Sequence, residues 1–268
     1  MAFNEFGTLN VPRRLLLGPG PTDVNPRVLR VMSNPITGYL DSAYFDVLED
    51  VSALLKSVYR TSQNTMVVAG SGSCGMEAGF HSLLETGDTV VICSYGHFCE
   101  RMILMCQRMD VNVVAVRSKW GRVMDPQLLS DELSKHKRVK LVAAIHAETS
   151  TGVLQPLEDL SKIANDHGSL FATDMVTSLS GCRVEFDEWG IDYAYSGTQK
   201  CLAGPPGLSP IAVSDRALNV VRMRDRPPAS WYMDLDLIDR YWGHEHEHHH
   251  TSPVSMMYAL REALVLAL

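Results

Sequence analysis

The feature that most constrains the fold is a regular alternation of short apolar segments, rich in β-branched residues, with segments of helical periodicity. The apolar segments lie at residues 65–69, 89–93, 112–116, 139–145, 169–173, 192–195 and 209–213. The segments with helical periodicity lie at residues 76–84, 98–108, 126–136, 157–167 and 215–224. Strands that alternate with helices form a mostly parallel sheet with helices on both faces. The sequence therefore predicts an α/β fold around a seven-stranded, mostly parallel sheet.

The chain divides into three expected parts. Residues 1–22 predict an N-terminal arm that ends in the letters LGPGPT, and residues 23–252 predict the large α/β domain. Residues 253–268 predict the start of a long helix that is apolar over most of its surface and needs something to pack against. Because neither a cap nor a breaker closes this helix, we expect it to lead to a C-terminal domain that is absent from this chain.

Two residues with useful chemistry follow predicted strands. Asp174 comes directly after the segment 169–173, and Lys200 lies between the segment 192–195 and the letters AGPPG at 203–207. Ligands of such sheets bind beyond the carboxyl ends of the strands, so we expect both side chains in one site. A lysine that forms a Schiff base and a carboxylate that keeps a pyridine nitrogen protonated suit an imine-forming cofactor. The alternative is a solvated surface lysine, as most lysines are.

A glycine-rich loop, GSGSCG at residues 70–75, joins a predicted strand to a predicted helix. Free amides at a helix N-terminus bind anions, and Ser71 and Ser73 add hydroxyl donors. The same letters match GxGxxG, which leaves an NAD-dependent dehydrogenase open. That class expects an acidic residue at the end of the second strand, about 20 residues on. The letters VICSY at 91–95 contain none, so the loop favours the phosphate of a smaller cofactor.

Composition and charge narrow the classes of function. A net charge of −7 gives no support for nucleic-acid binding. No apolar run approaches the roughly 20 residues that span a bilayer, and residues 1–5 lack the pattern of a secretory signal. The six cysteines form no CxxC pair and no zinc-ligand spacing. Several lie in apolar segments, which is typical of reduced thiols in a cytoplasmic protein.

A histidine cluster, HEHEHHH at residues 244–250, raises the question of a metal site. Imidazoles and carboxylates are good ligands for zinc, nickel or copper. However, no second ligand group stands out elsewhere in the sequence, and adjacent histidines rarely form a closed tetrahedral site. We expect a polar interface loop there, with adventitious metal binding as the alternative and no functional metal.

Several motifs in fixed order carry a resemblance to a known family. They are LGPGPT at 17–22, GSGSCGME at 70–77, HAETSTGVLQP at 146–156, SGTQK at 196–200 with AGPPG at 203–207, and YWG at 241–243 before HHT at 249–251. With these motifs the chain resembles, nearly end to end, the class V, fold-type I, pyridoxal-phosphate aminotransferases. Within that family it is most similar to the alanine–glyoxylate and serine–pyruvate aminotransferase group.

The resemblance implies a role for each matching residue. Lys200 would form the Schiff base with pyridoxal phosphate and then move the α-proton of the substrate. Asp174 would pair with the pyridinium nitrogen. The other implied cofactor contacts are Ser71, Gly72, Ser73 and Gln199 at the phosphate, Phe98 stacked on the ring, Val176 beneath the ring, and Thr149 near the phenolic oxygen.

The resemblance also implies a homodimer with shared active sites, because Thr251 would reach the phosphate of the neighbouring subunit's cofactor. His248 stands where the family usually has a tyrosine. An imidazole can still donate to phosphate, although its charge depends on pH near neutrality. The family binds the substrate carboxylate through an arginine of the C-terminal domain, which lies beyond this chain. We therefore expect the chain to hold the cofactor but to transaminate poorly.

The implied reaction moves an amino group from a small amino acid, alanine or serine, to glyoxylate or pyruvate by ping-pong Schiff-base chemistry. The substrates would be small amino acids and 2-oxo acids. Alternatives of the same fold are a ureidoglycine–glyoxylate transaminase, a 2-aminoethylphosphonate transaminase, and a cysteine desulfurase or lyase. The desulfurase branch usually stacks a histidine where this chain has Phe98, although His97 is adjacent. Alternatives of another class are the dehydrogenase and an inactive truncated remnant.

Overall fold

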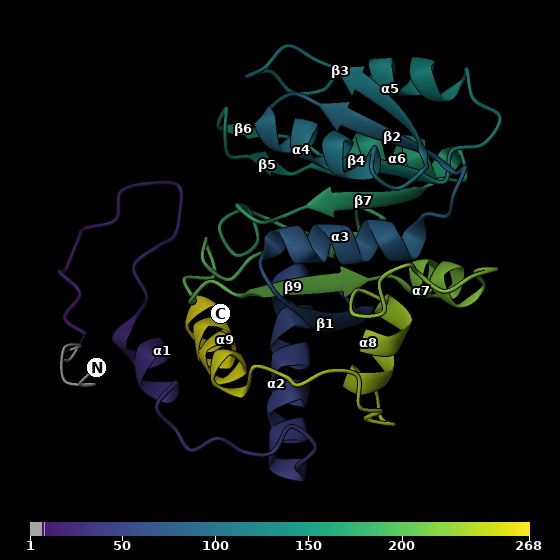
Figure 1. Ribbon diagram of the computed structural model, residues 1–268. Coiled ribbons are helices and arrows are strands. Elements are labelled where there is room, and N and C mark those ends of the chain that lie inside the picture. Colours follow the sequence, from purple (N-terminus) through teal and green to yellow (C-terminus); the bar gives the residue numbers. More distant parts are fainter. Residues whose placement is uncertain (1–6, 8) are drawn as a thin grey trace, which may run out of the picture.

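A seven-stranded sheet forms the centre of the computed structural model, which describes residue 7 and residues 9–268 (Figure 1). The strand order is β1-β9-β8-β7-β4-β2-β3. The strands are β1 (Asn64–Ala69), β2 (Thr89–Ser94), β3 (Asn112–Arg117), β4 (Leu141–Ile145), β7 (Leu170–Asp174), β8 (Tyr193–Tyr195) and β9 (Leu208–Val213). All pairings are parallel except those of β9, which is antiparallel to β1 and to β8. The predicted seven-stranded, mostly parallel sheet is confirmed.

Burial explains why the inner strands are continuous apolar runs. Every residue of β4, β7, β8 and β9 is buried, because helices cover both faces of the sheet. The edge strand β3 is only partly buried. The start of the predicted arm, residues 1–6 and 8, lies outside the described residues, and so does the segment 1–5 that argued against a secretory signal.

The helices pack on this sheet in two layers. Helices α2 and α3 both contact β1 and β9, from opposite faces (Figure 1). The helices are α1 (Pro26–Val31), α2 (Ser42–Tyr59), α3 (Gly72–Leu83), α4 (His97–Cys106), α5 (Pro126–Leu133), α6 (Glu158–Asp166), α7 (Asp215–Arg222), α8 (Leu235–Trp242) and α9 (Val254–Ala267). The predictions for α3 to α7 and for α9 are confirmed, whereas α1, α2 and α8 were not predicted. Within residues 9–268, none of these helices has the length and apolar character that crossing a membrane requires.

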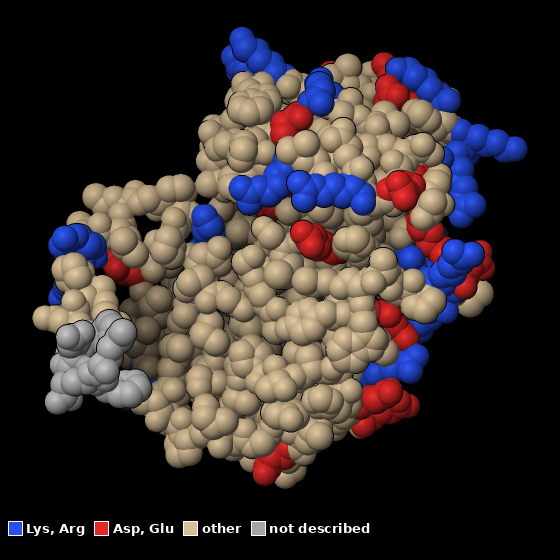
Figure 2. All heavy atoms as spheres, viewed as in Figure 1, with Lys and Arg blue, Asp and Glu red and all other residues tan. Residues whose placement is uncertain are grey.

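The last helix, α9, packs against α1 and α2. Two ion pairs support this packing, Arg27 with Glu262 at 2.6 Å and Arg261 with Asp50 at 2.7 Å. In Figure 1 the chain before α1 forms an extended arm at one side of the molecule, and the end of this arm, residues 19–22, contacts the turn after β8. In Figure 2 acidic and basic side chains are interspersed along the rim of the molecule, and much of the face in view carries no charged side chain.

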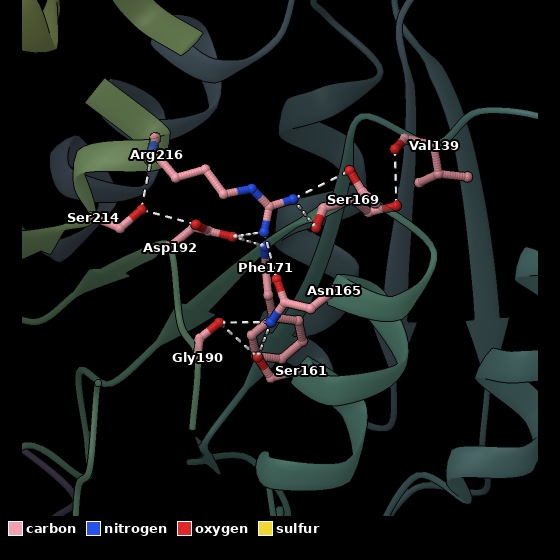
Figure 3. Close-up of polar contacts among 11 residues, drawn as sticks. Val139, Ser161, Asn165, Ser169, Phe171, Gly190, Asp192, Ser214 and Arg216 are labelled. Atoms are coloured by element: carbon pink, nitrogen blue, oxygen red, sulfur yellow. Dashed lines mark hydrogen bonds and ion pairs between the residues drawn. The ribbon is translucent and has the colours of Figure 1, made fainter. Parts of the chain in front are cut away.

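Asp192 lies directly before β8, at the end of this strand that is opposite to Lys200 and Asp174. Its hydrogen bonds connect neighbouring segments at this end of the sheet (Figure 3). Its buried carboxylate accepts from the Phe171 amide at 2.9 Å and from the Ser214 hydroxyl at 2.8 Å. Arg216 reaches this carboxylate at 3.4 Å and also donates to the Ser169 carbonyl oxygen at 2.8 Å. Buried polar groups that are paired in this way hold neighbouring strands in register.

Candidate active site

A cavity of about 250 Å³ opens beyond the carboxyl ends of β7 and β8. Most of the residues predicted for the site line it: Ser71, Gly72, Ser73, Phe98, Thr149, Asp174, Val176, Gln199 and Lys200. Its remaining lining residues were not predicted: Met76, Arg101, Ile145, Ala147 and Tyr195. The structure thus gathers side chains from segments that are far apart in the sequence into one cavity.

Asp174 and Lys200 reach the cavity from neighbouring parallel strands. Asp174 is the last residue of β7 and pairs in register with Tyr195, the last residue of β8. Lys200 follows Tyr195 after a short turn and lines the same cavity. Its Nζ donates to the carbonyl oxygen of Pro19 at 2.6 Å, and it forms no ion pair with a carboxylate of the described residues. A primary amine and a carboxyl group therefore line the same cavity.

The Asp174 carboxyl group is buried, with 8% of its surface exposed. One oxygen, Oδ1, accepts from the backbone amide of Val176 at 2.8 Å. Burial raises the pKa of Asp174 from 3.8 to about 6, because desolvation penalises the ionised form. The hydrogen bond from Val176 opposes this shift in pKa but does not cancel it. Such a carboxylate gains most from a cationic partner inside the cavity.

The N-terminus of α3 forms an electropositive wall of the cavity. Ser71 is its N-cap residue, but the Ser71 side chain makes no capping hydrogen bond and remains available to a ligand. The amides of Gly72 and Ser73 have no acceptor within the described part of the chain. A side chain at Gly72 would place its Cβ 2.8 Å from Val176 Cγ2, so this position favours glycine. Unpaired amides at the start of a helix form an anion site.

Two further walls come from α4 and from the turn after the short strand β5 (Ala147–Glu148). Phe98 lies in the first turn of α4, and the guanidinium carbon of Arg101 lies 4.7 Å from the centre of its ring. Thr149 follows β5, which pairs with β6 (Val153–Leu154). The Thr149 hydroxyl donates to that of Thr177 at 3.1 Å. The cavity thus has an aromatic wall and a hydroxyl group on different sides.

His248 and Thr251 do not line this cavity. Both are exposed on the loop between α8 and α9. Their roles in a neighbouring subunit's site stay predictions. No group of three or more His, Cys, Asp and Glu side chains within residues 9–268 is placed to hold a metal ion.

The adjacent pair His249 and His250 is buried, and its tautomers follow from its contacts. The two Nδ1 atoms are 2.9 Å apart, and His249 Nε2 lies 3.0 Å from the carbonyl oxygen of Trp231. Burial lowers the pKa of both rings, that of His250 to about 4, so both are neutral. A carbonyl oxygen only accepts, so His249 carries its hydrogen on Nε2 and His250 carries its hydrogen on Nδ1. The His250 Nε2 atom is then a buried acceptor without a partner among the described residues.

Sequence reasoning missed Arg101, although its position carried a signal. Arg101 stands three residues after Phe98 in α4, and residues at that spacing share a helix face. Tyr195 was also not predicted for the site, because the apolar pattern of residues 192–195 indicates only a strand that leads to Lys200. Its hydroxyl oxygen is buried without a hydrogen-bond partner among the described residues.

Comparisons with known proteins agree on one family. The model of the family "Aminotransferase class-V" matches residues 20–267. The (S)-ureidoglycine–glyoxylate transaminase of Bacillus subtilis is 36% identical over 97% of this chain and 67% of its own length. The alanine–glyoxylate aminotransferase of Rattus norvegicus is 37% identical over 96% of this chain and 63% of its own length. The crystal structure of an alanine–glyoxylate aminotransferase from Nostoc sp. superimposes with a TM-score of 0.95 at 40% identity, over 98% of this chain and 70% of that one.

These matches define an α/β protein with the fold of an aminotransferase. The chain belongs to the class V aminotransferase family. The predicted family is confirmed, in preference to the alternative of an NAD-dependent dehydrogenase, whereas the phosphate-binding role of the GSGSCG loop stays a prediction. The chain spans about two thirds of the length of the relatives that it matches.

Proposed function

We propose that the cavity binds pyridoxal phosphate and that the chain supplies this site to an aminotransferase. The observation that carries the proposal is the placement of Lys200 and Asp174, from neighbouring parallel strands, on one cavity of about 250 Å³. This pair of groups suits a cofactor that has an aldehyde at one position and a basic ring nitrogen at another.

The chemistry of the cavity walls fits this cofactor at three points. The unpaired amides of Gly72 and Ser73 suit the phosphate, and Gln199, which also lines the cavity, carries a side-chain NH₂ group that can donate to it. The desolvated Asp174 carboxyl suits a protonated ring nitrogen, because a cation would restore its ionised form. The amine of Lys200 suits the aldehyde.

Pyridoxal phosphate, when bound, supplies an electrophilic carbon and an electron-withdrawing ring. The carboxylate of Asp174 would stabilise the positive charge on the ring nitrogen. Lys200 Nζ would accept a proton from the substrate carbon and return it. Phe98 and Val176 would flank the ring, and Ser71 and Thr149 would donate hydrogen bonds.

The substrate proposal follows the relatives. We propose that the amino donor is a small amino acid, alanine or serine, and that the acceptor is glyoxylate or pyruvate. Relatives named for glyoxylate at 36–37% identity support the acceptor. Because one of them is named for ureidoglycine, that amino donor is the second candidate.

We propose a homodimer in which each subunit contributes to its partner's site, and a cytoplasmic location. The exposed positions of His248 and Thr251, outside their own subunit's cavity, support the shared site. The location is supported by the cysteines, since all six thiols of the chain are free.

The test is an absorbance spectrum of the purified chain with pyridoxal phosphate, followed by borohydride reduction and peptide mapping. We expect a yellow protein whose reduced adduct maps to Lys200, and no adduct in Lys200→Ala. Loss of the yellow band on addition of alanine, serine or ureidoglycine would rank the donors, and its return with glyoxylate or pyruvate would rank the acceptors. A protein that stays colourless and carries no adduct at Lys200 would contradict the proposal.

A further inference from the structure

Glu148 is a buried carboxylate that lies next to the cavity and that the proposed mechanism does not use. It ends strand β5, and 1% of its surface is exposed. It forms no ion pair with any basic side chain of the described residues. A buried charge without a counter-ion is costly unless hydrogen bonds replace its water. Its hydrogen-bond partners therefore indicate what it does.

Those partners are two of the first backbone amides of α4, the thiol of Cys99 and the nearby Ser150. Glu148 Oε2 accepts from the amide of Phe98 at 3.0 Å and from that of Cys99 at 3.2 Å. Glu148 Oε1 accepts from the amide and the hydroxyl of Ser150, at 3.0 and 2.7 Å. The Ser150 hydroxyl in turn accepts from the amide of His97 at 2.9 Å. The segment 148–150 thus satisfies the leading amides of the helix that carries Phe98.

The local sequence of α4 leaves this task to Glu148. The N-cap residue of α4 is Gly96, which has no side chain to accept a hydrogen bond. A Cβ at Gly96 would lie 2.2 Å from Glu148 Cγ, so only glycine lets the carboxylate approach. The negative charge also lies at the positive end of the helix dipole, where an anion is stabilised. Glu148 therefore caps α4 from a different strand.

The cap bears directly on the aromatic wall of the cavity. The amide that Glu148 Oε2 holds belongs to Phe98, whose ring lines the cavity on which Asp174 and Lys200 also lie. Arg101, one helical turn on, places its guanidinium carbon 4.7 Å from the centre of that ring. We infer that Glu148 is a positioning residue that fixes the Phe98 ring in the orientation required to pack on the cofactor, an inference that rests on the proposed function.

A carboxylate suits this position better than an amide. Both oxygens of Glu148 accept, one from α4 and the other from Ser150. In Glu148→Gln one oxygen becomes an NH₂ group, which faces a donor on one of the two sides and cannot satisfy it. Glu148→Ala removes both sets of hydrogen bonds and leaves buried amides unpaired. The two variants therefore form a graded series.

The experiment places a single 4-fluorophenylalanine at position 98 of the full chain and records its fluorine NMR spectrum with and without pyridoxal phosphate. The dissociation constant of the cofactor is measured in the same samples. The matched control is Asp192→Asn, because Asp192 is also a buried carboxylate that accepts a backbone amide, at 2.9 Å, but at the other end of β8. It separates loss of positioning from loss of stability.

We expect a moved or broadened fluorine resonance in cofactor-free Glu148→Gln, and a larger change in Glu148→Ala. The dissociation constant should rise about tenfold in Glu148→Gln and further in Glu148→Ala. Asp192→Asn should leave both readouts at the parent values. If Glu148→Ala does not fold, the isosteric Glu148→Gln decides alone.

The inference is overturned if the Glu148 variants leave the fluorine resonance of the cofactor-free chain unchanged, or if Asp192→Asn changes it equally. A parent chain that binds no pyridoxal phosphate contradicts the proposed function instead. In that case the cofactor-free spectra still decide whether Glu148 positions Phe98, so the two failures are distinguishable.

Discussion

Lys200 donates from Nζ to the carbonyl oxygen of Pro19 at 2.6 Å and so joins the lysine to the end of the N-terminal arm. The backbone is tied at the same place, because the Thr22 amide donates to the carbonyl oxygen of Gln199 at 3.0 Å. Gly20 lies between these contacts. The arm therefore holds the amine before any ligand enters the cavity, and this dependence can be tested at a single position.

Gly20→Ala should displace the lysine. A Cβ at Gly20 would lie 2.5 Å from Lys200 Cδ and 2.7 Å from Nζ, and the φ of +126° at Gly20 is one that alanine rarely adopts. We expect the rate of adduct formation between Lys200 and pyridoxal phosphate to fall at least about tenfold, as is typical when a reacting group is misplaced. Stopped-flow absorbance measures this rate.

Gly18→Ala is the matched control for this substitution. It lies in the same arm, and a Cβ at Gly18 meets nothing within 4 Å. It should leave the rate at the parent value. Equal rates in Gly20→Ala and the parent would show that the contact between the arm and Lys200 does not orient the amine.

Asp174→Asn should stabilise the cofactor-free chain at neutral and alkaline pH. Burial raises the pKa of Asp174 in the folded chain from 3.8 to about 6. Stability from this group is fully present below the unfolded pKa of 3.8 and is lost as pH rises through 6. Asparagine does not titrate, so the free energy of unfolding of the variant should exceed that of the parent by about 3 kcal/mol at about pH 8. The excess should shrink toward zero as pH approaches 3.8.

Urea unfolding at several pH values measures this difference, and the same variant should bind pyridoxal phosphate more weakly. The two effects have opposite signs. The buried carboxylate destabilises the cofactor-free chain, whereas in the complex it pairs with the protonated ring nitrogen. A variant that loses stability at every pH would show that Asp174 is already well solvated or paired. Residues of a functional site are expected to carry such a cost.

Much of the fold was predictable because the inner strands leave a strong sequence signal. Each predicted strand overlaps an observed one, and this includes β9, which is antiparallel to both of its neighbours, β1 and β8. The 18-residue helix α2 was missed although its signal was present. Asp41 caps it through the Ala43 amide at 2.9 Å, and Tyr44, Leu48 and Val51 recur at helical spacing on its buried face.

The sequence predicts those parts of the site that the ends of strands determine. It does not predict contacts between side chains from segments that are far apart in the sequence. Asp174 and Lys200 follow strands, so their meeting follows from the parallel sheet. The contact of Glu148 with α4 depends on how the β5 hairpin folds over the start of the helix, and the sequence spacing of about 50 residues carries no signal for it. Pairings of this kind follow only from the folded packing.

His250→Gln should make the chain less sensitive to acid. Burial lowers the pKa of His250 from 6.5 to about 4 in the folded chain, where the rings of Tyr232, Tyr241 and His249 surround it. The unfolded chain then binds the proton more readily, so stability from this group is present above pH 6.5 and is lost as pH falls through 4. Between about pH 7 and about pH 4.5 we expect the parent to lose about 2 kcal/mol more than the variant.

Thermal or urea unfolding across this pH range measures the effect, with His244→Gln as the control. His244 belongs to the same cluster but is exposed, so its substitution should not change the acid sensitivity. His146, whose pKa burial also lowers to about 4, acts with the same sign and remains in both variants. Identical pH profiles for His250→Gln and the parent would show that the pair is solvated.

Gly96→Ala and Glu148→Ala should be strongly coupled in stability. A Cβ at Gly96 would lie 2.2 Å from Glu148 Cγ and 2.8 Å from Oε2, so Gly96→Ala alone must push the carboxylate away from α4. We expect it to cost about 1–3 kcal/mol, the usual range for overpacking a core. Glu148→Ala alone should cost a similar amount, because it leaves the amides of Phe98 and Cys99 unpaired.

In the double variant the clash no longer exists, since residue 148 ends at its own Cβ. Adding Gly96→Ala to Glu148→Ala should then cost less than about 1 kcal/mol. This remaining cost arises because alanine is a poorer N-cap residue than glycine. The free energies of unfolding from urea titrations of the four chains give the coupling, which should be about 1–2 kcal/mol. If the costs were additive, the Glu148 carboxylate could move away from Gly96 without a loss of stability. The start of α4 at His97 would then not depend on hydrogen bonds from Glu148.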